Sequence, residues 1–293
     1  MDSSTGNHVL IRKVRDERFS IDDLTHYRLS LLVGLHNFQF CVTDDREQVC
    51  LLIEDYALEH ITSPDALLSV LYKLIENHDL LMAGYWKSVI LGVKTQQHTL
   101  VPAPFYDEKH LSDYLALSTD LEAHDGLYFY PHTQSEAVSV FAANKKLVER
   151  IRSIYPSLTL NVLHQGSVLT EGFQRNQNFA EAQDMYLHID REHFSIVVMQ
   201  NGQLRFYNRF AYAHSQHIIK YTMTALQELG LSQHDSRVRV WGNIPVKSEH
   251  YQALYRYIRH LSYGDKPAFL TFGYAFDEIP DHQYFDLYSL SVC

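Results

Sequence analysis

The sequence predicts an α/β protein built from two related halves, each a mixed sheet with flanking helices. In the second half, three short runs rich in aromatic and β-branched residues are separated by polar breaks: 185–189, 194–198 and 203–210. The second break contains Asn201-Gly202, a strong hairpin signal because both residues tolerate positive φ. We therefore expect a three-stranded antiparallel meander.

A helical period follows this meander. Its apolar face consists of Ile218, Thr222, Ala225, Leu226 and Leu229. Gly230 can supply the left-handed residue that ends a helix. A β-branched run at 238–241 and a second helix capped by Ser248 come next. The order expected here is meander, helix, strand, helix.

The first half repeats this order. Three runs, 29–33, 38–43 and 48–53, are followed by a helix with Ser63 as N-cap and Pro64 at its first position, and then by a strand at 89–93. Setting residues 32–38 over residues 188–194 needs no gap, and the hydrophobic rhythm then matches on both sides. This agreement predicts an internal two-fold repeat.

The remaining segments define the predicted domain organisation. Residues 1–25 are polar and are expected to form an arm or an early edge segment, 26–176 the first half with a small subdomain inserted at about 96–135, and 177–293 the second half. Within and after the insert we expect strands at 126–130, 137–142 and 158–163, and helices at 107–117, 145–155 and 166–176. Residues 174–183 are the most linker-like, and the aromatic-rich run 268–293 predicts strands that finish the second sheet.

Composition excludes several classes of protein. The chain has 293 residues, 46% hydrophobic residues and a net charge of -10 without an extended basic cluster, which excludes a nucleic-acid surface. No apolar run is long enough to span a membrane, and no secretory signal is recognisable at the N-terminus. The three cysteines, Cys41, Cys50 and Cys293, fit a reducing compartment. A cytoplasmic protein is therefore expected.

Several strings of the chain are similar to an uncharacterised bacterial family, a domain of unknown function with an actin-like fold. They are Tyr27-Arg-Leu-Ser-Leu, Asn37-Phe-Gln-Phe, His98-Thr-Leu-Val-Pro, Leu204-Arg-Phe-Tyr-Asn-Arg-Phe, Trp241-Gly-Asn-Ile and Pro280-Asp-His-Gln-Tyr-Phe-Asp-Leu. More distantly, the order of elements resembles the actin-like ATPase superfamily, including the bacterial FtsA and PilM proteins. The resemblance implies duplicated actin-like (ribonuclease H-like) halves with a cleft between them.

The resemblance also indicates where an ATPase site would lie. In active members the first turn of each meander carries Asp-x-Gly, because glycines let backbone N–H groups approach the phosphates and the aspartates hold hydrated Mg²⁺. Here Leu32 stands at the place of the first aspartate, followed by Gly34 and His36. His188 stands at the second place, followed by Asp190 and no glycine.

A third motif of the superfamily is altered as well. The Gly-Gly pair that binds adenosine corresponds here to Gly242-Asn243. Taken together, the changed positions lead us to expect neither ordinary ATP hydrolysis nor bound ATP and Mg²⁺ as a cofactor. No catalytic residue can be assigned on this basis.

Other chemistry finds little support in the sequence. The histidines are numerous, but pairs such as His214 and His217 have no third ligand nearby, so we expect no metal site. The Gly-x-Ser-x-Gly motif that surrounds a nucleophilic serine is absent around Ser167.

Two functions remain open at this point. One is a degenerate pseudo-ATPase scaffold that works through contacts with a protein partner. The alternative is a nucleotide- or small-molecule-binding enzyme with an altered site, in which His36, His188 and Asp190 face the cleft as acid–base or ligand residues.

Overall fold

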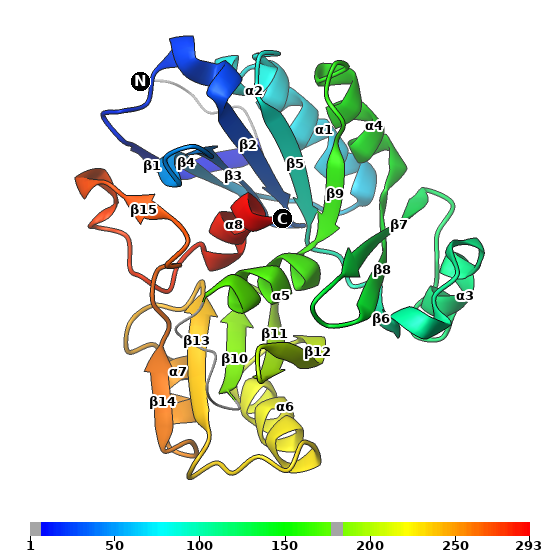
Figure 1. The fold of residues 1–293 in the computed structure, drawn as a ribbon, viewed down its shortest axis with the longest axis vertical. Coiled ribbons are helices and arrows are strands. Elements are labelled where there is room, and N and C mark those ends of the chain that lie inside the picture. Colours follow the sequence, from blue (N-terminus) through cyan, green and yellow to red (C-terminus); the bar gives the residue numbers. More distant parts are fainter. Residues whose placement is uncertain (1–6, 177–183) are drawn as a thin grey trace. The chain divides into compact units, whose positions relative to one another are not determined.

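The computed structural model describes residues 7–176 and 184–293, and these divide into two compact units (Figure 1). The first unit runs to Val168 and also takes in Leu270–Asp277 and Cys293. The second comprises Leu169–Phe269 and Glu278–Val292. Each unit is described by itself. The predicted linker at 174–183 lies largely outside the described residues.

The first unit contains a seven-stranded mixed sheet of order β1-β4-β3-β2-β5-β9, with β15 beside β4. Its strands are β1 (His8–Arg15), β2 (Tyr27–Val33), β3 (Asn37–Asp44), β4 (Val49–Leu58), β5 (Ser88–Val93), β9 (Asn161–His164) and β15 (Thr271–Phe272). Strands β2, β3 and β4 form the expected antiparallel meander, whereas β5 runs parallel to β2 and β9 parallel to β5. The early segment contributes β1 at one edge of the sheet.

Helices in this unit begin where capping residues allow it. Outside the insert they include η1 (Ile21–His26), α1 (Pro64–Glu76), α2 (Asp79–Met82) and α4 (Lys145–Ile154). At α1 the Ser63 hydroxyl accepts a hydrogen bond from the Ala66 amide, and Pro64 occupies the first turn, as predicted. At α4 the Asn144 carboxamide oxygen likewise accepts a hydrogen bond from the Leu147 amide.

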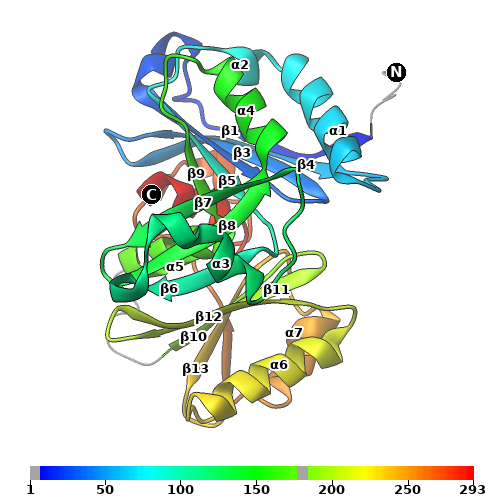
Figure 2. The same cartoon turned by 90° about the vertical axis from the view of Figure 1, so that its right-hand side faces the viewer.

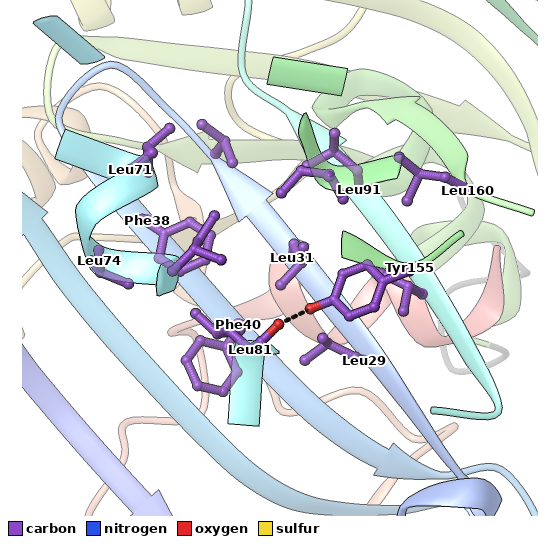
Figure 3. Packing of buried hydrophobic residues seen from close by; sticks show 14 of the residues in the cluster. Leu29, Leu31, Phe38, Phe40, Leu71, Leu74, Leu81, Leu91, Tyr155 and Leu160 are labelled. Atoms are coloured by element: carbon purple, nitrogen blue, oxygen red, sulfur yellow. Dashed lines mark hydrogen bonds between the residues drawn. The ribbon is translucent and has the colours of Figure 1, made fainter. Parts of the chain in front are cut away.

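A hydrophobic core lies between one face of this sheet and the helices (Figure 3). Leu31 of β2 and Phe40 of β3 are buried in it, as are Leu71 of α1 and Leu81 of α2. The Tyr155 hydroxyl donates to the Leu81 carbonyl, so the one polar group drawn among these side chains is satisfied. Burying a large aliphatic or aromatic side chain stabilises the fold by about 1.5–3 kcal/mol.

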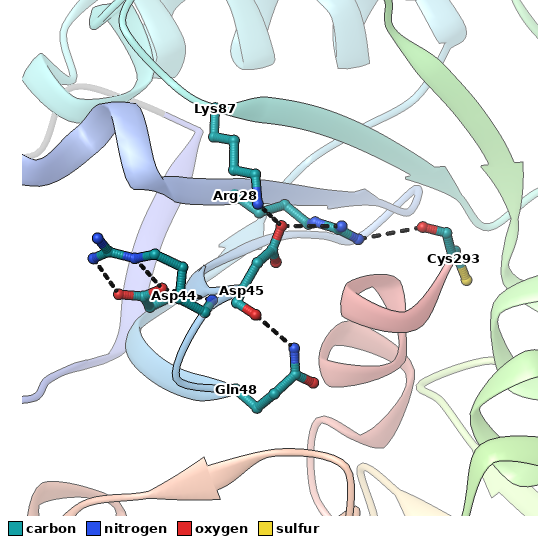
Figure 4. A network of polar contacts seen from close by, with 7 residues as sticks. Arg28, Asp44, Asp45, Gln48, Lys87 and Cys293 are labelled. Carbon is teal, nitrogen blue, oxygen red and sulfur yellow. Dashed lines mark hydrogen bonds and ion pairs between the residues drawn. The ribbon is translucent and has the colours of Figure 1, made fainter.

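A polar network holds the start of β2 (Figure 4). Arg28 lies 3.2 Å from the Asp45 carboxylate, and the Lys87 ammonium lies 3.1 Å from the same oxygen. Arg28 also donates to the carbonyl of Cys293 at 3.2 Å. The last residue of the chain is thereby tied to the first unit.

The insert is a separate small sheet of order β6-β8-β7. Its elements are β6 (His98–Pro102), η2 (Ala103–Phe105), η3 (Glu108–His110), α3 (Leu111–Ala116), β7 (Asp125–His132) and β8 (Ala137–Asn144). Leu115 of α3 packs with Val101, Val138 and Val140 in a core of its own. The small sheet therefore continues to Asn144, where the chain enters α4.

The second unit repeats the strand order of the first. Its sheet has the order β12-β11-β10-β13-β14, and β13 and β14 run parallel to β10 as β5 and β9 run parallel to β2. Its elements are most of α5 (Gln165–Arg175), β10 (Asp184–Ile189), β11 (His193–Gln200), β12 (Gln203–Ala211), α6 (Ser215–Glu228), β13 (Arg237–Gly242), α7 (Glu249–Tyr255), β14 (His260–Tyr263), α8 (Phe285–Ser289) and η6 (Leu290–Val292). The first turn of α5 and the short η5 (Tyr274–Phe276) belong to the first unit. Asn201 and Gly202 both have positive φ, at 53° and 75°, as the hairpin prediction requires.

The prediction of strands for residues 268–293 is wrong. The only strand in this run is β15, and it pairs with β4 of the first sheet instead of finishing the second. The other regular elements of this run are helical: α8, which is labelled in Figure 1, and the short η5 and η6. All five residues of α8 are buried, so this short helix lacks the polar face that marks a helix in sequence. Its Phe and Tyr residues favour strands only weakly, and burial overrides that preference.

The described helices include none that is long and apolar enough to cross a membrane.

Candidate functional site

The turns after β2 and β10 are built in the same way. In the first turn the Gly34 amide donates to the Asn37 carbonyl at 2.9 Å. In the second the Asp190 amide donates to the His193 carbonyl at 2.8 Å. These positions correspond when residues 32–38 are set over residues 188–194.

Two further backbone hydrogen bonds repeat in the same register. The carbonyl at the fifth position of each aligned segment accepts from the residue that ends the meander: His36 from Leu58 and Glu192 from Tyr212, both at 2.9 Å.

In both units, the carbonyl of the last residue in the first strand of the meander also accepts a hydrogen bond. Val33 accepts from Lys94 at 2.9 Å, and Ile189 from Asn243 at 2.7 Å. The two turns are therefore the same structure built from different residues.

Leu32 occupies the first position that would carry an aspartate, and its side chain is fully buried. Side chains alternate along a strand, so Leu32 lies on the opposite face of the sheet from Leu31, which belongs to the core beneath α1. An aliphatic side chain without solvent contact cannot hold a hydrated cation.

His188 occupies the second such position and is 3% exposed. Its Nε2 lies 3.4 Å from Oδ1 of Asp286, which is as deeply buried. This contact lacks hydrogen-bond geometry, and neither ring nitrogen of His188 has a hydrogen-bond partner within the described part of the chain. The Asp286 oxygen accepts instead from the Leu287 amide at 3.0 Å. A buried histidine thus lies beside a buried acid, at a position where the actin-like resemblance led us to expect an open carboxylate.

Gly34 and His36 lie in the first turn. Gly34 has an ordinary backbone conformation, and a Cβ at this position would collide with the Asn37 carboxamide. His36 is half-buried and uses its carbonyl in the hydrogen bond to Leu58. Close packing against Asn37 accounts for a small residue at position 34.

The second turn is negatively charged. One carboxylate oxygen of Asp190 accepts from the Arg191 amide at 2.9 Å, and Glu192 is exposed beside it. The Tyr212 hydroxyl donates to the Asp190 carbonyl at 2.6 Å. Burial, together with the charges of Asp190 and Glu192, raises the pKa of Tyr212 to about 12. The same two charges would repel a phosphate group.

Gly242 and Asn243 follow β13. Gly242 has a φ of +100°, and a Cβ there would strike the carbonyl of Ile189. Its amide donates to the His282 carbonyl at 2.8 Å, and the His282 ring lies 2.8 Å from the Ile244 carbonyl. Burial lowers the pKa of His282. The positive φ and the nearby Ile189 carbonyl thus require glycine at position 242, whether or not adenosine binds there.

The structure brings the predicted site residues together in two groups. Leu32, Gly34 and His36 lie at the end of β2 in the first unit. The other group, His188, Asp190, Gly242 and Asn243, lies at the adjacent ends of β10 and β13, where Ile189 pairs with Gly242. Among residues 7–176 and 184–293, no three His, Cys, Asp or Glu side chains come together in a way that could hold a metal ion.

Sequence reasoning missed a groove of about 350 Å³ in the first unit. It is lined by Glu108, Leu111, Leu127, Tyr128, Phe129, Tyr130, Arg152, Leu160, Asn161, Val162, Leu163 and Cys293. These residues come from η3, α3, β7, α4, the connection before β9, β9 itself and the end of the chain. The groove could not be read from the sequence because it depends on which strands stand at the sheet edges.

Solved structures show the same fold. A Bacteroides thetaiotaomicron protein described as having an actin-like ATPase fold and unknown function is 15% identical, with a TM-score of 0.79 over 94% of this chain and 99% of that one. A chain of the PilM–PilN type IV pilus biogenesis complex is 13% identical, with a TM-score of 0.59 over 90% of this chain and 97% of that one. No curated protein matches the chain. The chain has the actin-like ATPase fold.

A protein-family comparison covers most of the sequence. Residues 16–261 match the family described as protein of unknown function (DUF3822). That match runs from before β2 into β14 and includes the insert, and the chain therefore belongs to this family.

Proposed function

We propose that this protein is a degenerate, non-hydrolysing member of the actin-like ATPase fold that acts as a scaffold through protein contacts. The observation that carries the proposal is the complete burial of Leu32 at the end of β2. Phosphoryl transfer in this fold relies on carboxylates that hold Mg²⁺ and on donors that cradle the phosphates. A buried leucine supplies neither.

The second turn supports the same proposal. His188 is withdrawn from solvent beside Asp286, and the turn that follows presents Asp190 and Glu192. Two negative charges near the expected position of a triphosphate oppose its binding.

A protein-binding role agrees with one structural neighbour. The PilM–PilN structure is a protein complex by its description, and a chain of it shares this fold. We extend to the present chain only the general mode of action, that is, recruitment of another protein. The three cysteines, Cys41, Cys50 and Cys293, are odd in number and fit a reducing compartment, so we place the scaffold in the cytoplasm. Recovery of the untagged protein mainly from periplasm would contradict this placement.

The alternative function is a small-molecule-binding enzyme with altered groups. It is favoured by one feature, the buried contact between His188 and Asp286, because histidine–carboxylate pairs withdrawn from water are frequent in acid–base sites. Asp190, in the turn that follows His188, would be a further ligand or acid–base residue in that case.

Isothermal titration separates the two functions. ATP and ADP are titrated into the full chain with and without Mg²⁺. The scaffold predicts no binding with a Kd below about 1 mM, which corresponds to about -4 kcal/mol. Micromolar binding of either nucleotide would overturn the proposed function in favour of the alternative.

A further inference from the structure

The groove in the first unit lies where two sheet edges approach each other. Strand β7 is the last strand of the small sheet, and β9 is the last strand of the seven-stranded sheet. The two strands are in contact but are not hydrogen-bonded neighbours. An edge strand presents main-chain N–H and C=O groups that can pair with another chain. The walls of the groove therefore offer backbone hydrogen bonds as well as side chains.

The middle of the groove is apolar. Leu127 and Phe129 come from β7, Val162 from β9 and Leu111 from the start of α3. Phe129 is 38% exposed, and the other three are half-buried. A volume of about 350 Å³ is near the lower limit of ligand sites, so it fits a few side chains and not a folded domain.

Opposite charges line the same groove. Arg152 of α4 and Glu108 of η3 are both exposed, and neither has an ion-pair partner in the described part of the chain. Arg150, on the same helix, differs because its guanidinium is held by Glu76. Arg152 and Glu108 are thus available to charges on a bound partner.

We propose that this groove binds a short extended segment of a partner protein, and this inference rests on the proposed scaffold function. The segment carries apolar side chains in its middle, an acidic residue that pairs with Arg152 and a basic residue that pairs with Glu108. Its main chain hydrogen-bonds to the open edge of β7, as in strand addition to an exposed sheet edge. The two charges fix the direction in which the segment lies, since a reversed segment would place like charges together.

The test begins with the full chain and a displayed library of random nine-residue peptides. Selected peptides should share an apolar centre with an acidic residue on one side and a basic residue on the other. The best of them is then synthesised with a fluorophore, and its Kd is measured by fluorescence anisotropy. A failure of the library to yield any binding peptide would overturn the proposal.

Charge reversal locates the bound peptide. Arg152→Glu should weaken binding about ten- to a hundredfold, which is the effect of losing a charge-assisted hydrogen bond and gaining repulsion. The matched control is Arg256→Glu, which makes the same change at an exposed arginine that lines a separate groove beside α7 in the second unit. The control should bind as the wild type does. Equal weakening by both variants, or by neither, would contradict the proposed site.

A charge swap gives the sharpest result. The double variant Glu108→Lys/Arg152→Glu should lose the selected peptide and bind a peptide in which the acidic and basic residues are exchanged. Thermal midpoints of all variants should stay near that of the wild type, because both side chains are exposed. If the selected peptide binds the double variant as tightly as it binds the wild type, peptides do not bind in this groove, although the scaffold function can still be right. Nucleotide binding in the titration described above would instead overturn the scaffold function.

Discussion

Nε2 of His188 lies 3.4 Å from Oδ1 of Asp286, and both side chains are almost completely excluded from solvent. The first residue belongs to the strand that opens the second sheet, and the other to the short helix near the end of the chain. In an active ATPase of this fold we would expect an open carboxylate in place of His188. In the present chain His188 instead contacts Asp286, so this position links β10 to α8 within the second unit.

Removing the imidazole should therefore destabilise the second unit. His188→Leu removes the polar neighbour of the buried Asp286 carboxylate, and the loss of such a neighbour costs about 1–3 kcal/mol. Urea unfolding at neutral pH measures this loss.

Asp281→Ala is the matched control for that measurement. Asp281 lies 3.5 Å from Lys266 in the same unit, but it is 63% exposed. Loss of such a surface pair should cost less than about 1 kcal/mol. If His188→Leu were no more destabilising than this control, the pair would not hold the two elements together.

A second prediction concerns acid stability and Glu54 of β4. Its side chain is fully buried, with the Lys13 ammonium at 2.8 Å and the His78 ring at 2.9 Å, and the Tyr56 hydroxyl donates to it. Burial alone would raise the pKa of Glu54, but the hydrogen bonds from His78, Lys13 and Tyr56 outweigh it and lower the pKa from 4.5 to about 2. A depressed acid pKa adds stability above the unfolded-state value, and this stability is lost as the pH falls toward the folded-state value.

The expected contribution of Glu54 at neutral pH is roughly 3 kcal/mol. The free energy of unfolding of the wild type should thus fall from pH 5 toward pH 2, and Glu54→Gln should show a shallower fall. Asp113→Asn, at a carboxylate that is 69% exposed, serves as the control. Parallel curves for the wild type and Glu54→Gln would show that Glu54 keeps an ordinary pKa.

A third prediction tests whether the backbone conformation, and not nucleotide binding, requires glycine at position 242. Alanine there must adopt a φ of +100° and place its Cβ against the Ile189 carbonyl, so Gly242→Ala should cost at least about 2 kcal/mol. Gly84→Ala is the control, because a Cβ at Gly84 meets no atom within 4 Å. Chemical denaturation of both variants measures the difference. If Gly242→Ala and Gly84→Ala were equally stable, the backbone conformation would not explain the glycine at position 242.

Most of the fold could be predicted because local patterns coincided with the tertiary structure. The Asn201-Gly202 turn and the Ser63 cap follow from local backbone chemistry, and each lies where expected. The alignment of Leu32 with His188 held as well, since the backbone hydrogen bonds around the two turns repeat in that register.

The remaining features depend on contacts between residues distant in sequence. Helix α8 was mistaken for strand because its burial on all sides hides the helical period. The contact of His188 with Asp286 joins residues far apart in the chain, and no local pattern indicates it. The groove beside Arg152 depends on the order of strands within two sheets, which sequence periodicity does not determine.

Leu32→Asp restores the residue type that an active member would carry and tests most directly whether this position is now core. The thermal midpoint of the variant is measured with and without Mg²⁺ and ATP, beside Leu35→Asp, an exposed position in the same turn. A buried unpaired carboxylate costs several kcal/mol, so the midpoint of Leu32→Asp should fall by about 10 °C, independently of nucleotide, while Leu35→Asp stays near the wild type. An unchanged midpoint for Leu32→Asp that rises when Mg²⁺ and ATP are added would contradict the scaffold and show a surviving nucleotide site.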